Sequence, residues 1–151
     1  MKKLATKDIL FVTTQLLLFV LYFIPFSSMH FEANGITHPL GIALTMVGLL
    51  FILFAIIQLN KNLTPFPTPK EQGTLIKTGL YKSVRHPIYS GIILASIGYG
   101  LYNYSFWEIG IGFILWILFY FKSRYEESLL VLQYPDYEEY RKNTPRFFLF
   151  K

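Results

Sequence analysis

Cysteine is absent from this 151-residue chain, which excludes disulfides, thiolate metal sites and a cysteine nucleophile. Charge is scarce as well, because Asp, Glu, Lys and Arg make up 15% of the residues whereas hydrophobic residues make up 53%. No G-x-G-x-x-G motif follows a strand, and no soluble α/β segment could carry one. His30, Glu32 and His38 lack metal-ligand spacing, so no metal site is predicted. The composition is that of a membrane protein.

Four apolar runs hold the hydrophobic excess, at residues 9–26, 40–59, 88–104 and 106–121. A spanning helix needs roughly 20 apolar residues, with about 17 as the lower limit. The first two runs are long enough, whereas the last two need their flanking aromatic residues as interfacial anchors. We therefore predict an all-α, polytopic membrane protein with four transmembrane helices in a single domain over residues 1–151. A signal peptide is the alternative for the first run, but its apolar part is too long.

The basic residues predict the orientation of these spans. All 14 Lys and Arg residues lie before the first run, between the second and third runs, or after the fourth run. By the positive-inside rule, the N- and C-termini, a loop over residues 60–87 and a tail over residues 122–151 are cytoplasmic. The net charge of +5 then fits a face beside anionic lipid headgroups, and no nucleic-acid partner is predicted.

The most informative stretch is residues 79–91, which read G-L-Y-K-S-V-R-H-P-I-Y-S-G. It sets Arg85 and His86 at the entrance of the third apolar run. A helix that begins at Pro87 carries its partly positive end there, together with unpaired backbone N–H groups. The stretch therefore predicts a site for an anionic group. The alternative is that Arg85 reaches only lipid phosphates and that His86 is an ordinary interfacial residue.

The tail after the fourth run has its own helical pattern. Glu126 and Glu127 lie on a segment that we expect to follow the cytoplasmic interface or to cover a cavity between the spans; a solvated helix face is the alternative. Pro135 interrupts this segment. Asp136 is then predicted to cap a further helix, with Glu139 three residues on in an acidic variant of the capping box.

Small residues recur on one face of the third run, at Gly91, Ala95 and Gly98. Such a face permits close contact between helices. The pattern serves contacts within a chain and between chains equally well, so the oligomeric state stays open.

Motif blocks follow one another in a recognisable order. They read G-x-Y-x-x-x-R-H-P-x-Y at residues 79–89, E-E-x-x-L at 126–130, Y-x-x-Y at 137–140 and T-P-R-F at 144–147. This order resembles the isoprenylcysteine carboxyl methyltransferase and phospholipid methyltransferase family of integral membrane enzymes, from about residue 63 to residue 148. The chain departs from the family where Tyr134-Pro135 replaces the usual Phe-Gly.

The resemblance implies methyl transfer from S-adenosylmethionine to a lipid or prenylated acceptor, within a membrane helical bundle. By matching position, it implies cofactor-binding roles for Tyr81, His86, Pro87, Tyr89, Glu126 and Glu127, and catalytic roles for Arg85 and Glu127. Arginine can pair a carboxylate, which leaves Arg85 to hold either the donor or the acceptor. An amine acceptor needs a base, for which Glu127 and His86 are the candidates.

Two other functions fit parts of the sequence. A NADPH-dependent membrane reductase of the sterol reductase type has a broadly similar C-terminal half, although four spans are few for that group. A small non-catalytic lipid-binding protein is the second alternative, and the intact Arg-His and Glu-Glu pairs argue against it.

Overall fold

The computed structural model describes residues 5–26, 29–32 and 34–148, so Lys2, Lys3 and Lys151 of the charge count lie outside it. Apart from isolated bridge positions at His30, Ser105 and Phe147, the regular structure of this part is helical. It comprises α1 (Thr6–Tyr22), α2 (Thr37–Leu59), η2 (Asn60–Asn62), α3 (Leu80–Ser83), α4 (Pro87–Tyr102), α5 (Phe106–Gln133) and α6 (Tyr137–Asn143). The predicted all-α class is confirmed.

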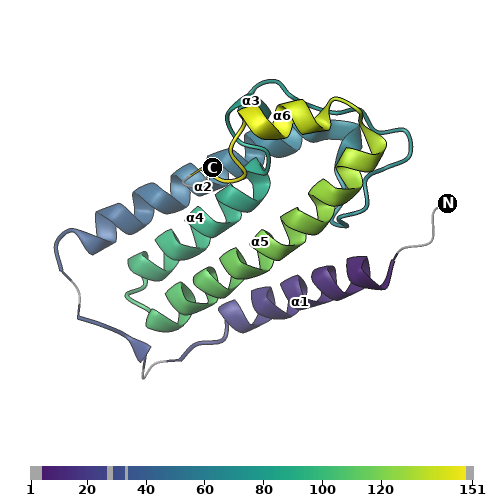
Figure 1. The fold of residues 1–151 in the computed structure, drawn as a ribbon. Coiled ribbons are helices and arrows are strands. Elements are labelled where there is room, and N and C mark those ends of the chain that lie inside the picture. Colours follow the sequence, from purple (N-terminus) through teal and green to yellow (C-terminus); the bar gives the residue numbers. More distant parts are fainter. Residues whose placement is uncertain (1–4, 27–28, 33, 149–151) are drawn as a thin grey trace.

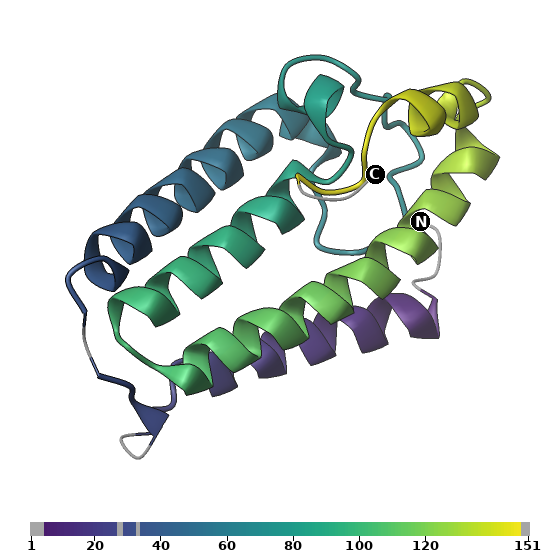
Figure 2. The same ribbon diagram turned by 60° about the vertical axis from the view of Figure 1, so that its left-hand side comes forward.

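The four long helices alternate in direction and lie side by side (Figures 1 and 2). Helix α4 packs between α2 and α5, and α1 packs against α5. The start of α1, the connection from α2 to α4, and α6 therefore share one end of the bundle, which we call the charged end. This is the antiparallel order that the predicted topology requires. The orientation in a membrane stays a prediction.

In the described part of the chain, two helices are long and apolar enough by themselves to cross a membrane. They are Thr37–Asn62, which joins α2 to η2, and α5 (Phe106–Gln133). The apolar runs predict four such helices, but α1 has 17 residues and α4 has 16, at or below the lower limit for spanning. Many large apolar side chains of α1 and α2 are exposed, as expected of surfaces that contact lipid. The number of spans therefore stays a prediction.

Close contact between α2 and α4 depends on glycine. A Cβ atom added at Gly48 would lie 2.5 Å from the backbone nitrogen of Ala95, and one added at Gly41 would lie 2.5 Å from that of Tyr102. Gly91 and Gly98 face α2 in the same way. The small-residue face of α4 thus serves a contact within the chain.

The segment after residue 121 is helical up to the position before Tyr134-Pro135, in line with its sequence pattern. Helix α5 continues without a break to Gln133, and α6 folds back over the charged end (Figure 1). Asp136 precedes α6 as predicted, but its carboxylate pairs with Lys77 and makes no side-chain bond to the helix. The acidic capping box is therefore not formed, because the aspartate has a more strongly charged partner.

Candidate functional site

The first half of the site lies on residues 84–86, a short segment between α3 and α4 that we call the link. The backbone N–H of Arg85 donates to the carbonyl of Pro145 at 2.9 Å, and that of His86 donates to the carbonyl of Arg146 at 3.2 Å. His86 then precedes the first residue of α4, Pro87, whose fixed φ suits a helix start. The chain after α6 is thereby fastened along this link, which brings residues about 60 positions apart together.

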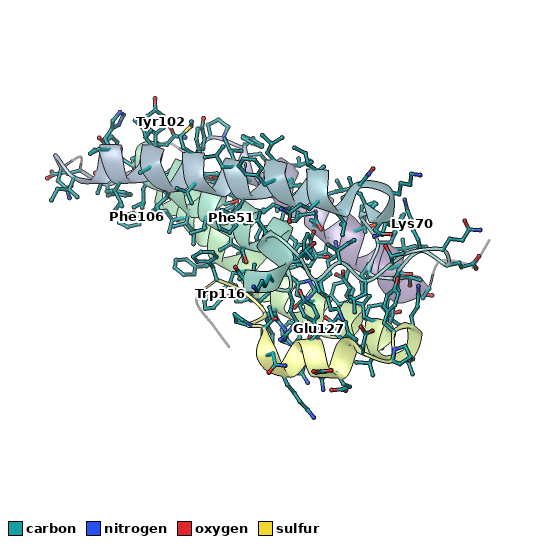
Figure 3. The ribbon with its side chains drawn as sticks, turned by 90° about the horizontal axis from the view of Figure 1, so that it is seen from above. Phe51, Lys70, Tyr102, Phe106, Trp116 and Glu127 are labelled. Atoms are coloured by element: carbon teal, nitrogen blue, oxygen red, sulfur yellow. The ribbon has the colours of Figure 1, made fainter. Side chains whose placement is uncertain are left out.

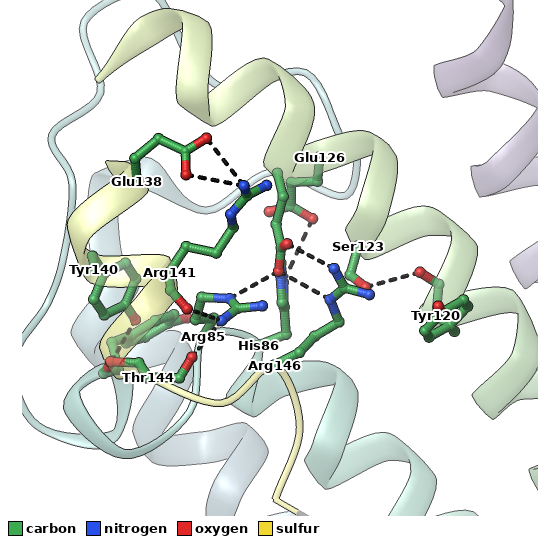
Figure 4. Close-up of polar contacts among 12 residues, drawn as sticks. Arg85, His86, Tyr120, Ser123, Glu126, Glu138, Tyr140, Arg141, Thr144 and Arg146 are labelled. Carbon is green, nitrogen blue, oxygen red and sulfur yellow. Dashed lines mark hydrogen bonds and ion pairs between the residues drawn. The ribbon is translucent and has the colours of Figure 1, made fainter. Parts of the chain in front are cut away.

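The carboxylate of Glu127, on α5, contacts side chains of the link and of the residues after α6. Its Oε1 lies 2.9 Å from Nε of Arg85, 3.0 Å from Nε2 of His86 and 3.1 Å from Nε of Arg146. Its Oε2 accepts from Nη2 of Arg146 at 2.8 Å. Figure 4 shows Arg85, His86 and Arg146 converging at this point. We call these four residues the Glu127 cluster.

The Glu127 cluster lies at the charged end, past Phe121, where the apolar part of α5 stops. Glu127 is 1% exposed. Burial alone would raise the pKa of Glu127, but the hydrogen bonds from His86 and Arg146, together with the charge of Arg85, hold that pKa well below its usual range. Glu127 is therefore ionised at neutral pH and acts as a fixed anion.

An ionised Glu127 determines the tautomer of His86. A carboxylate can only accept hydrogen bonds, so Nε2 of His86 carries a proton. In the neutral imidazole, Nδ1 then keeps its lone pair, and it lies 3.9 Å from Oε2 of Glu126. The His86 ring stacks on the Tyr89 ring with centroids 5.4 Å apart, and the Tyr89 hydroxyl donates to Glu126 at 2.8 Å.

Helix α6 and the residues after it close over the link. Arg85 donates through Nη1 to the carbonyl of Arg141 at 2.7 Å and to that of Thr144. The hydroxyl of Tyr140 donates to the carbonyl of Tyr81 in α3. Burial raises the pKa of Tyr140 to about 12, so this hydroxyl keeps its proton at neutral pH. These bonds tie the tail to α3 and orient Arg85.

Two polar cavities adjoin the cluster. The small polar cavity has a volume of about 100 Å³, and the loop after α2 and three tyrosines of the tail line part of it. The large polar cavity has a volume of about 290 Å³ and extends toward α1. Both cavities are lined by Tyr81, Arg85, His86 and Glu126.

An apolar cavity of about 440 Å³ lies between α4 and α5. Ser90 and three aliphatic residues of α4 line it, together with Phe113 and Trp116 of α5 and two phenylalanines of the tail. Trp116 and Glu127, both labelled in Figure 3, mark the apolar and charged parts of α5. Because the backbone N–H of Ser90 donates to the carbonyl of His86 at 3.0 Å, this cavity begins one helical turn from His86.

The predicted site residues divide into two groups. The structure brings six of them to the cavity walls, namely Tyr81, Arg85, His86, Pro87, Tyr89 and Glu126. Glu127 lies behind the wall, in the cluster. The predicted set lacks Arg146, although the T-P-R-F block contains it. It also lacks Lys122 and Gln15, whose sequence positions indicate a functional role only weakly. Lys122 is a lysine directly after the fourth apolar run, and Gln15 is an amide within the first.

His30 and Glu32 lie between α1 and α2, and His38 lies in the first turn of α2. The ring of His38 packs against that of Tyr102, with centroids 4.6 Å apart. Across residues 5–26, 29–32 and 34–148, no group of three or more His, Asp and Glu side chains could hold a metal ion.

The sequence of the chain is similar to known proteins. The chain is 28% identical over 110 residues to the cobalt-zinc-cadmium resistance protein CzcN of Cupriavidus metallidurans, a stretch that covers 72% of this chain and 46% of that relative. The chain thus spans about half the length of the curated relative it matches. The phospholipid methyltransferase family model matches residues 36–137, which include the 79–91 stretch and the Glu126-Glu127 pair. Because this match covers more than half of the chain, the protein belongs to the phospholipid methyltransferase family.

Proposed function

We propose that this chain transfers the methyl group of S-adenosylmethionine to an amphiphilic acceptor in the membrane, of the isoprenylcysteine carboxylate or phospholipid amine type. One observation carries the proposal: the first turn of α4 lies between the polar and the apolar cavities. His86 lines the polar cavities, and Ser90 lines the apolar one. A polar donor from the charged end and an apolar tail from between α4 and α5 would meet at this turn.

The proposal includes the four-span topology with cytoplasmic termini. That orientation would open the polar cavities to the cytoplasm, where a water-soluble donor is available. The apolar cavity would then lie at the depth of the lipid tails, because its lining comes almost entirely from apolar residues.

The polar cavities offer groups that suit the donor. Arg85 uses Nε and Nη1 within the described structure, which leaves Nη2 for a carboxylate of the donor or the acceptor. Glu126 can accept from an ammonium or from ribose hydroxyls, and the ring of Tyr81 suits stacking on adenine. When bound, the cofactor would supply an electrophilic methyl group on a sulfonium.

The chain itself would contribute orientation, exclusion of water and, for some acceptors, a base. Methyl transfer is an in-line displacement, so alignment of the reacting atoms is the main requirement. Glu127 is ionised and fully hydrogen-bonded, which makes it a poor proton acceptor and a good positioning residue for Arg85 and His86. For an amine acceptor, Nδ1 of His86 would take the proton. A carboxylate acceptor would need no base.

Calorimetric titration of S-adenosylmethionine into detergent-purified protein tests the donor site. We expect wild-type protein to bind, and Arg85→Ala and Glu126→Gln to weaken binding by about tenfold or more, because each removes a charged hydrogen-bond partner. Glu138→Gln, at an exposed carboxylate outside the cavities, should bind as wild type does. Absence of binding by wild-type protein would contradict the proposal.

Turnover needs a separate measurement. Purified protein incubated with membranes and a radiolabelled methyl donor should label a lipid or a prenylated molecule. Thermal stabilisation by NADPH in place of S-adenosylmethionine would favour the reductase instead. Donor binding without any labelled product would favour the non-catalytic lipid-binding function.

A further inference from the structure

Lys122 is a buried cation that the Glu127 cluster does not use. It is 1% exposed and lies on α5 directly after the apolar part of the helix. Its Nζ donates to Oε1 of Gln15 on α1 at 2.7 Å and to the carbonyl of Pro65 at 2.9 Å. An ammonium has three donors, and the third has no hydrogen-bond acceptor in the described residues; Nζ lies over the ring of Tyr89, 5.4 Å from its centroid. In the described part of the chain, no carboxylate lies within ion-pair distance of this Nζ.

Glu126 lies one turn further along the same face of α5. Its side chain is 25% exposed, and it accepts one hydrogen bond from Tyr89. Lys122 and Glu126 both line the large polar cavity. The two charges could form an i,i+4 ion pair, but Gln15 and Pro65 hold the ammonium while Tyr89 holds the carboxylate.

Two opposite charges are thus held apart on one cavity wall. Their Cα atoms are separated by about 6 Å along the helix axis. Because both charges border the same cavity, a ligand group of the opposite sign at each position would gain a favourable electrostatic interaction. A ligand with an anion and an ammonium a few bonds apart would satisfy both.

We infer that Lys122 and Glu126 form a zwitterion-binding site, in which Lys122 holds the anionic end and Glu126 the ammonium. The inference rests on the proposed function for the source of the ligand. Two sources carry this chemistry: the amino-acid end of the methyl donor and the phosphoethanolamine headgroup of a lipid.

Equilibrium titration of full-length protein in detergent tests the site with three ligands. S-adenosylhomocysteine keeps the carboxylate and the ammonium, whereas 5′-methylthioadenosine has the same adenosine without the amino-acid end. Dihexanoyl phosphatidylethanolamine carries the phosphate and the ammonium. The variants are Lys122→Met, Lys122→Arg and, as the matched control, Lys82→Met at an exposed lysine of α3.

We expect Lys122→Met to weaken the binding of one of the two zwitterionic ligands by at least about tenfold and to leave 5′-methylthioadenosine binding unchanged. Lys122→Arg, which keeps the positive charge, should retain part of the lost affinity. Weaker S-adenosylhomocysteine binding assigns the anion to the donor, and weaker phosphatidylethanolamine binding assigns it to the lipid. Unchanged affinity for both zwitterions, or an equal loss for all three ligands, overturns the inference. If wild-type protein binds neither adenosyl ligand, the proposed function fails while the lipid titration still tests Lys122.

Discussion

Glu126 and Glu127 are neighbours in the sequence but have different surroundings in the structure. Glu127 faces the link and the tail, is 1% exposed and is bonded by three side chains. Glu126 lies about 100° around α5, borders both polar cavities and accepts one hydrogen bond. One carboxylate therefore builds the site, while the other is available to a ligand. Two adjacent glutamates in the sequence predict a functional position, but they do not show which one is buried and which one faces a cavity.

The largest expected effect comes from Glu127→Gln. The substitution leaves the buried guanidinium of Arg85 and that of Arg146 without their anion, so the free energy of unfolding should fall by about 3–5 kcal/mol. An SDS titration followed by circular dichroism measures it. Glu126→Gln is the matched control and should cost less than about 1 kcal/mol. Equal losses in the two variants would remove the distinction between the carboxylates.

Acid should reproduce part of this loss. Because the pKa of Glu127 is depressed in the folded state, its contribution to stability is present above the unfolded pKa of about 4.3 and declines as the pH falls below it. The free energy of unfolding should therefore fall more steeply between about pH 5 and pH 3 in wild-type protein than in Glu127→Gln. Parallel pH profiles would contradict the assignment of Glu127 as the buried anion.

Tyr89→Phe tests the role of Glu126 as the carboxylate available to a ligand. It removes the hydroxyl that orients Glu126 and leaves the contacts of Glu127 intact. We expect S-adenosylhomocysteine binding to weaken by roughly fivefold, which corresponds to about 1 kcal/mol for one hydrogen bond. Titration calorimetry measures this change. If Tyr89→Phe lowered the free energy of unfolding by more than it weakened the free energy of binding, Tyr89 would support the fold, as Glu127 does, and not the ligand site.

The smallest effect is expected at an exposed carboxylate. Glu138 pairs with Arg141 at 2.9 Å, and both side chains are more than 40% exposed. Glu138→Gln should change the free energy of unfolding by about 0.3 kcal/mol, and high salt should abolish the difference. Unfolding at low and high ionic strength measures it. A loss comparable to that of Glu127→Gln would show that burial is not the cause of the large effect.

The sequence predicted the helices better than their ends. Hydropathy places the end of the fourth run at residue 121, because charged residues follow. Backbone hydrogen bonds do not depend on side-chain polarity, however, so α5 continues until Pro135 disfavours a helical conformation at Tyr134. The start of α4 was predictable, since proline at the first helical position is a local signal.

The site was predictable only in part, for a related reason. Arg85, His86 and Glu126 belong to motif blocks, and the structure brings these blocks to one end of the bundle. Lys122 and Gln15 are 107 positions apart, and no local pattern joins them. Their contact depends on the packing of α1 against α5.

The sequence by itself determined the all-helical class, the start of α4 and the gathering of charge beyond the apolar runs, because these follow from local hydropathy and backbone rules. The tertiary structure alone decided which carboxylate is buried and which faces a cavity. It also set Lys122 opposite Gln15 and placed the apolar cavity one turn from His86. These features depend on the directions in which side chains project between helices distant in the sequence, and packing sets those directions.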